Sequence, residues 1–274
     1  MGTKVKLALA LLLLWCVGAN AALIPTDLDV VVSVNFDDSP GGEIEGNGTQ
    51  IASAGVIVGG VFDGFSVDGT QSTPSSGLSS VLTDLSDGFS IDSRTRVSND
   101  SQVDESILPG FGFDAFFDIT NTSLIDTYLL TFNIAYSVAL EAGGGDAYSD
   151  IEMDFINDLT DLWFLDISSD TTFGNYRNDQ DLPDFGGPMN ERSGVSINVL
   201  ITPGQSLFLE SQITTYLGAY VDGDFAAGTA ILSIGLNSAE KLQEPSPVNA
   251  PNTFIVLCIG LLTVLFKMQL KRKR

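Results

Sequence analysis

The feature that most constrains the fold is an alternation of apolar and polar residues with a period of two. Between Tyr128 and Leu140, apolar side chains occupy every second position, and polar side chains such as Thr131 and Asn133 lie between them. Successive side chains of a β-strand point to opposite faces, so this stretch predicts a long strand with one buried face. Residues 151–155 alternate in the same way after the segment AGGGD at 142–146, which is typical of a turn. The pattern predicts a hairpin with one wet face.

The same pattern recurs along the chain. Residues 195–201 and 207–213 alternate around a Thr-Pro-Gly-Gln turn, and residues 217–221 and 229–236 form a last expected pair around Asp-Gly-Asp at 222–224. Residues 28–36 predict an early strand, and a helical period of 3.6 is almost absent. We therefore predict an all-β protein, an antiparallel β-sandwich of jelly-roll-like type.

Both ends of the chain differ from this middle part. Lys4 and Lys6 precede an apolar run at 7–17, and Ala19 and Ala21 follow it with the spacing of a signal-peptidase site. Cleavage is expected before Ala22. Residues 254–266 are mostly apolar and carry no charge, and an extension to Leu270 with Lys267 reaching back to the interface predicts one short transmembrane helix. The expected cytoplasmic anchor consists of Lys267, Lys271, Arg272, Lys273 and Arg274.

These two ends define four expected segments. They are a signal peptide at 1–21, an exported β-sandwich domain at 22–236, a linker at 237–250 and a C-terminal segment at 251–274 that holds the membrane helix and the basic tail. Basic residues beside a membrane segment stay on the cytoplasmic side, so residues 22 to about 250 are expected outside the cytoplasm.

Composition narrows what the exported part can do. It carries all 35 acidic residues but only five of the 12 basic ones, which gives a net charge of −30. Such a charge repels nucleic acid and attracts cations, although it also serves plain solubility. The chain has no histidine, and its two cysteines, Cys16 and Cys258, lie in the apolar ends. A Ser-His-Asp triad, a His-ligated zinc site and a disulfide in the exported part are therefore excluded. We expect no required cofactor and no enzymatic activity.

Calcium is the candidate ligand that the charge suggests, because it binds several oxygen ligands that converge from a loop. The expected ligands are Asp179, Asp181 and Asp184 in one loop, and Asp222 and Asp224 in another. A short repeat adds a further candidate, since DGFSVD at 63–68 returns as DGFSID at 87–92. The repeat predicts either a pair of calcium loops or two similar strand starts in one sheet.

A carbohydrate-active protein is the alternative function. A glycosidase needs a carboxyl pair, and sugar-binding surfaces often carry aromatic side chains. Trp163 is the only tryptophan of the exported part, and it is either a sugar contact or a core residue.

The tail at Val248-Asn-Ala-Pro-Asn-Thr253, with the apolar run and basic cluster behind it, resembles the PEP-CTERM sorting signal. Val248, Pro251 and Thr253 match the family pattern, whereas Asn249 and Ala250 replace its usual Pro and Glu. The resemblance implies a surface protein of a Gram-negative bacterium. An exosortase-type protease would hold it at the inner membrane by its helix and then process it near this motif.

The same resemblance implies a structural or adhesive role in a biofilm or exopolysaccharide matrix, with exopolysaccharide as a partner. A eukaryotic single-pass receptor is the competing interpretation, since the chain has three Asn-x-Ser/Thr sequons at Asn47, Asn99 and Asn121.

Overall fold

The computed structural model describes residues 22–37, 44–68, 77–100, 104–158, 160–178 and 180–242. The predicted signal peptide, sorting motif, membrane helix and basic tail lie outside these residues, as does Asp179. Within the described ranges, no helix is long and apolar enough to cross a membrane.

Every regular element in the described part of the chain is a β-strand. The strands are β1 (Leu28–Asp37), β2 (Gly48–Val58), β3 (Val61–Asp68), β4 (Gly77–Val81), β5 (Gly88–Ser98), β6 (Ser106–Asn121), β7 (Thr127–Gly143), β8 (Ala147–Asn157), β9 (Thr160–Asp170), β10 (Tyr176–Arg177), β11 (Gln180–Asp181), β12 (Gly187–Ile201), β13 (Ser206–Ala219) and β14 (Phe225–Leu242). The predicted all-β class is confirmed.

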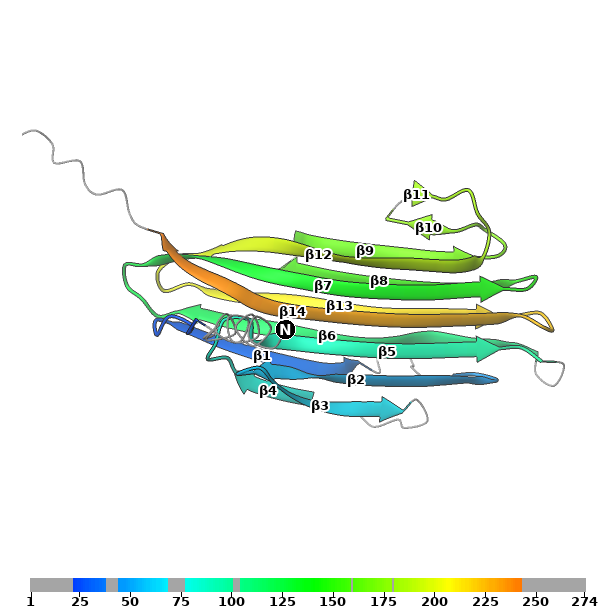
Figure 1. The fold of residues 1–274 in the computed structure, drawn as a ribbon, viewed down its shortest axis with the longest axis horizontal. Helices are drawn as coiled ribbons and strands as arrows, with labels where there is room; N and C mark the ends of the chain where they lie inside the picture. The colour runs from blue at the N-terminus through cyan, green and yellow to red at the C-terminus, as the bar shows by residue number, and fades with distance from the viewer. Residues whose placement is uncertain are drawn as a thin grey trace, which may run out of the picture. The chain divides into compact units, whose positions relative to one another are not determined.

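The strands form two antiparallel sheets (Figure 1). The eight-stranded sheet has the order β11-β10-β9-β8-β13-β6-β1-β4, and the six-stranded sheet has the order β12-β7-β14-β5-β2-β3. The longer strands run alongside one another (Figure 1). The sheets pack face to face, so the predicted β-sandwich is also confirmed.

Phenylalanine side chains fill the space between the sheets. Phe117 of β6 lies 5.1 Å from Phe132 of β7 and 5.7 Å from Phe89 of β5, measured between ring centroids. Phe132 in turn lies 5.4 Å from Phe155 of β8. All four rings are fully buried. The three pairs meet edge-on or tilted rather than face to face, which is the arrangement that aromatic quadrupoles favour.

The sandwich has a hydrophobic core of its own. Among the described residues, the buried apolar side chains lie between Ile24 and Leu236, within one compact unit that ends at Lys241. A domain with its own closed core can fold as a unit. The sandwich can therefore be studied without the residues that follow Leu242.

The expected hairpins are wrong, although their strands are right. β7 belongs to the six-stranded sheet and β8 to the eight-stranded sheet, so the Gly-rich turn between them crosses from one sheet to the other. The turns between β12 and β13 and between β13 and β14 cross in the same way. Each of these strands has one apolar face that must be buried. Two strands in facing sheets bury these faces against each other as well as two paired strands of one sheet bury theirs against a core.

The two ends of the sandwich differ from the predicted boundaries in one respect. Strand β14 continues to Leu242, beyond the predicted domain end at Leu236, and Lys241 bonds with Asp126 at its end. At the other end, the backbone N–H of Leu85 donates to the carbonyl of Ala22, at 2.7 Å.

Candidate functional site

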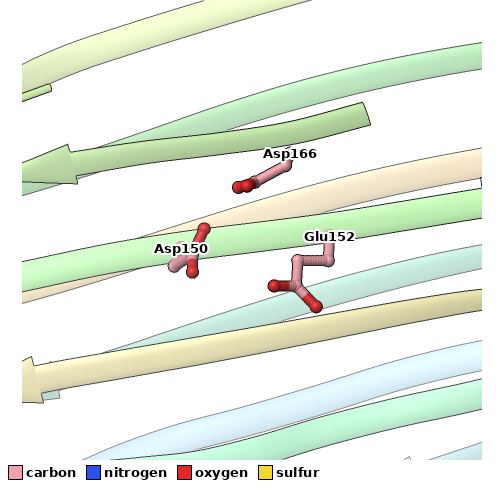
Figure 2. A group of neighbouring side chains, drawn as sticks. All are labelled: Asp150, Glu152 and Asp166. Carbon is pink, nitrogen blue, oxygen red and sulfur yellow. The ribbon is translucent and has the colours of Figure 1, made fainter. Parts of the chain in front are cut away.

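Three carboxyl groups meet on the outer face of the eight-stranded sheet. Asp150 and Glu152 lie on β8, and Asp166 lies on the neighbouring strand β9 (Figure 2). Glu152 is directly opposite Asp166 in the register of the two strands. One ligand oxygen from each residue lies within 4.8 Å of the others. We call these three residues the carboxyl cluster.

Strand alternation explains why these acids share a face. Ile151 and Met153 point into the core, so the side chains on either side of them point outward. Leu165 and Ile167 fix the outward direction of Asp166 on β9 in the same way. The cluster is therefore held by two strands whose inner faces are locked in the core.

Burial and mutual repulsion hold a proton in this cluster. Burial raises the pKa of Asp150 to about 7, and the charges of Asp166 and Glu152 and a hydrogen bond with Asp166 act in the same direction. The pKa of Glu152 is also raised, first by burial and then by Asp166. Among the described residues, the Oδ1 atom of Asp150 is buried and has no hydrogen-bond partner.

Neighbouring groups extend the acidic surface. Asp154 follows on β8, and burial raises its pKa to about 6 although it accepts a hydrogen bond from the backbone N–H of Gln212. Tyr216 of β13 lies opposite Asp150, and burial together with Glu152 and Asp150 raises its pKa. No Lys or Arg of the described residues lies on the outer faces of β8, β9 and β13.

Two kinds of chemistry fit such a cluster. Three carboxylate oxygens at this spacing are part of what a hard cation binds, although Ca²⁺ takes about 6–8 oxygen ligands. A protonated and an ionised carboxyl side by side are also the pair that acid–base chemistry on a glycoside needs.

The described residues that the sequence proposed for calcium do not belong to this cluster, and Asp179 lies outside the described residues. Asp181 and Asp184 are exposed, on β11 and in the loop after it. Asp222 is exposed in the turn between β13 and β14. Calcium binding by these residues stays a prediction.

Asp224 holds two turns together. Its carboxylate accepts hydrogen bonds from the backbone N–H groups of Gly145 (2.6 Å), Asp146 (3.0 Å) and Val221 (2.8 Å). The approach is so close that a Cβ on Gly144 would lie 2.0 Å from Oδ1 of Asp224. The described contacts of Asp224 are therefore those of a buried clamp between turns.

Trp163 lies on the inner side of β9, at the margin of the core. Its ring is 5.1 Å from that of Tyr136, and the side chain is half-buried against the core. The Tyr136 hydroxyl donates to Glu191 at 2.7 Å, and Arg177 donates to the same carboxylate through two nitrogens. This pair with Arg177 lowers the pKa of Glu191. The packing alternative for Trp163 therefore has contacts to support it.

The repeated hexapeptides lie in one sheet. DGFSVD belongs to β3 and DGFSID to the start of β5, and both strands pair with β2. Asp87 of the second copy is buried and accepts hydrogen bonds from the N–H groups of Gly59 and Asp84.

The carboxyl cluster itself was not predicted. The alternation of Asp150, Glu152 and Asp154 was visible in the sequence and placed them on one wet face. Asp166 could not be added, because the register of β9 against β8 has no signal in either strand.

Comparisons with known proteins name no family. No family model matches the chain, and no curated protein matches it. Among solved structures, the VP2 subviral particle protein of infectious bursal disease virus is 12% identical, with 84% of this chain and 72% of that chain covered and a TM-score of 0.16. Tailspike protein 4 of bacteriophage CBA120 is 13% identical, with 53% and 15% covered and a TM-score of 0.12. Likenesses this distant carry no argument about this chain.

Proposed function

We propose that this chain is an exported jelly-roll protein with a structural or adhesive role in an extracellular matrix. The jelly-roll assignment rests on four nested antiparallel pairs, β5 with β14, β6 with β13, β7 with β12 and β8 with β9. With the short β10 and β11 left out, the first strand of the series β5 to β14 pairs with the last, the second with the second last, and so on inward, as in a long antiparallel ribbon that is wrapped across the two sheets. The orders β12-β7-β14-β5 and β9-β8-β13-β6 are those of such a roll.

The observation that carries the proposal is the match between the sandwich and the expected exported segment. Hydrogen-bonded structure occupies the described residues from Ala22 onward, and the last strand ends at Leu242, inside the expected linker of 237–250 and before the expected sorting signal. The sandwich contains no cysteine or histidine, and its large core replaces disulfides as the source of stability. Export across the inner membrane, anchoring and release by an exosortase-type protease are the part of the proposal that rests on the sequence of the two ends.

Mass spectrometry of the protein from its native host tests the sorting part of the proposal. The mature protein is expected to begin at Ala22 and to lack the apolar residues after Pro251. As a control, a variant with Gln at Lys271, Arg272, Lys273 and Arg274 should keep its tail. An intact tail in the unaltered protein would contradict exosortase processing.

The structural role needs its own test. Deletion of the gene should weaken cohesion of the host's surface growth, and expression of the unaltered chain should restore it. Equal cohesion with and without the protein would argue against a matrix role.

Carbohydrate binding is the second candidate, and one observation favours it. Phe164 is 42% exposed and lies directly opposite Asp154, two residues from the carboxyl cluster. An exposed aromatic ring beside carboxyl groups is the combination that sugar stacking and hydrogen bonding use. Phe164→Ala should abolish binding to the host's exopolysaccharide, whereas Trp163→Phe should preserve it. Hydrolysis that is lost in Asp150→Asn would extend the proposal to catalysis, and a protein that binds no polysaccharide would end it.

A further inference from the structure

The two outer faces of the sandwich carry unlike charge. The acidic face consists of the outward side chains of β1, β6, β13, β8 and β9. Its carboxyl groups are those of Asp29, Asp114, Asp118, Asp150, Glu152, Asp154, Asp166, Asp170 and Glu210. No basic residue of the described chain points outward there, because Arg177 of β10 faces the other sheet and bonds with Glu191.

The opposite face, formed by the outward side chains of β12, β7, β14, β5 and β2, has the reverse character. We call it the arginine face. With β14 taken as far as Leu236, it holds Arg94, Arg96 and Arg192 against two described carboxyl groups, those of Asp92 and Glu141. Glu240 and Lys241 lie exposed beyond that point, at the end of β14. Three of the five basic residues of the exported part therefore lie on one surface.

The arginine face is also built for close approach. Most of its other side chains are Gly, Ala, Ser, Thr or Asn, and neighbouring strands tie them down by hydrogen bonds. These bonds join Ser90 to Ser233 (2.7 Å), Thr131 to Asn198 (2.9 Å) and Ser196 to Asn133 (2.8 Å). Small, mutually bonded side chains leave the longer arginines as the groups that reach outward.

These arginines have spare bonding capacity. Arg96 and Arg192 are exposed and form no ion pair with a described residue. Arg94 bonds with Asp92 through two nitrogens, at 3.2 and 2.9 Å, yet 68% of its side chain stays exposed. A guanidinium group binds carboxylates through paired donors and stacks on aromatic rings.

The acidic face offers both of these partners together. Phe116 and Phe208 stack on it with their ring centroids 5.2 Å apart, and Phe208 is 48% exposed. Glu210 lies opposite Phe116, and Asp118 lies opposite Phe208. An aromatic pair flanked by carboxylates is a surface that an arginine of another molecule fits through ion pairing and cation–π contact.

We propose that copies of this chain stack face to face, the arginine face of one on the acidic face of the next. The partner that binds each face is a second copy of this chain, because every copy carries one acidic face and one arginine face. The contact is heterologous, so each added copy leaves one face of each kind free, and the array stays open unless it closes into a ring. Stacking of copies would give the proposed matrix role a molecular basis. The biological meaning of the stacking rests on that proposed function, whereas the stacking itself does not.

The net charge of −30 decides how this stacking is ordered. Two acidic faces repel each other, so like-to-like packing is disfavoured and head-to-tail packing remains. At an ionic strength near 0.15 M the screening length is about 8 Å, which weakens repulsion between distant acids more than contact between paired groups.

Sedimentation velocity on residues 22–242, at about 0.15 M salt and increasing concentration, tests the proposal. The unaltered sandwich should form species larger than a dimer. Arg96→Gln with Arg192→Gln disables the arginine face, and Asp118→Asn with Glu210→Gln disables the acidic face. Each double variant alone should associate at least about tenfold more weakly.

Mixing the two double variants gives the sharpest outcome. The first keeps an intact acidic face and the second an intact arginine face, so the mixture should form a one-to-one dimer and nothing larger. Asp181→Asn with Asp184→Asn makes the same change of charge as the acidic-face variant, on β11 and in the loop after it, outside both faces, and should associate like the unaltered sandwich. Circular dichroism of each variant confirms folding.

Three results would overturn the stacking. They are an unaltered sandwich that stays monomeric, association that survives in either double variant alone, and a mixture that grows beyond a dimer. None of them bears on export or tail processing, which the mass spectra test separately. Binding of host polysaccharide without self-association would assign the acidic face to the carbohydrate alternative instead.

Discussion

The acidic face and the arginine face are built on the same scaffold, yet they differ in almost everything that solvent meets. Each belongs to an antiparallel sheet whose inner residues are locked in a shared core. On the acidic face, burial and the neighbouring carboxyl groups together raise the pKa of Asp150 to about 7. On the arginine face, Arg94 forms an ion pair with Asp92. Core packing fixes the direction of an outward side chain but not its chemistry. The outer faces are therefore where function is to be sought.

The largest effect on stability is expected in the hydrophobic core that lies between the two sheets. Phe117→Ala removes a fully buried ring between the sheets and should lower the free energy of unfolding by about 4 kcal/mol. Its neighbour Phe116 points to the acidic face, so Phe116→Ala should cost only about 1 kcal/mol. Denaturant unfolding of both variants measures the difference. Equal losses would mean that the inside–outside assignment of β6 is wrong.

The pH dependence of stability should come from the acidic face. The folded pKa of Asp150 is about 7, above its ordinary value of 3.8, so the folded state binds the proton more tightly than the unfolded state does. Stability should therefore be highest below pH 4, fall as pH rises to 7 and level off above that. The loss should be on the order of 2 kcal/mol after allowance for solvent screening around a half-buried group.

Asp150→Asn should remove much of this loss by raising stability at pH 8. Ser168→Ala, which changes a neutral residue opposite Asp150, should leave the pH dependence in place. Melting temperatures between pH 4 and 8 give the comparison. A curve for Asp150→Asn that is as steep as that of the unaltered sandwich would show that the proton is held elsewhere.

The smallest expected effect on stability comes from adding one carboxylate to each face. Ser168→Glu adds a carboxylate opposite Asp150 and should lower the free energy of unfolding by about 1 kcal/mol. Thr49→Glu adds one opposite Arg96 on the arginine face and should change it by no more than about 0.5 kcal/mol, in the stabilising direction. Added salt should narrow the gap, because both effects are electrostatic. Equal destabilisation by both substitutions would remove the electrostatic contrast between the faces.

The sequence by itself determined the strands and the direction of their side chains. The alternation around Phe132 and around Met153 is a local property, since the geometry of a strand sets its period of two without reference to other strands. The acids of β8 were placed on one wet face for the same reason. The all-β class and the sandwich followed from it.

Only the tertiary structure decided which strands are neighbours. The turns after β7, β12 and β13 have the composition of hairpin turns, yet each leads to the opposite sheet, because a strand with one apolar face can bury it from either side. Partner and register are set by long-range packing of the core, and that packing brings Asp166 beside Asp150 and Glu152. It also brings Arg192 of β12 onto the same surface as Arg94 and Arg96 of β5, although Arg192 lies far from both along the chain.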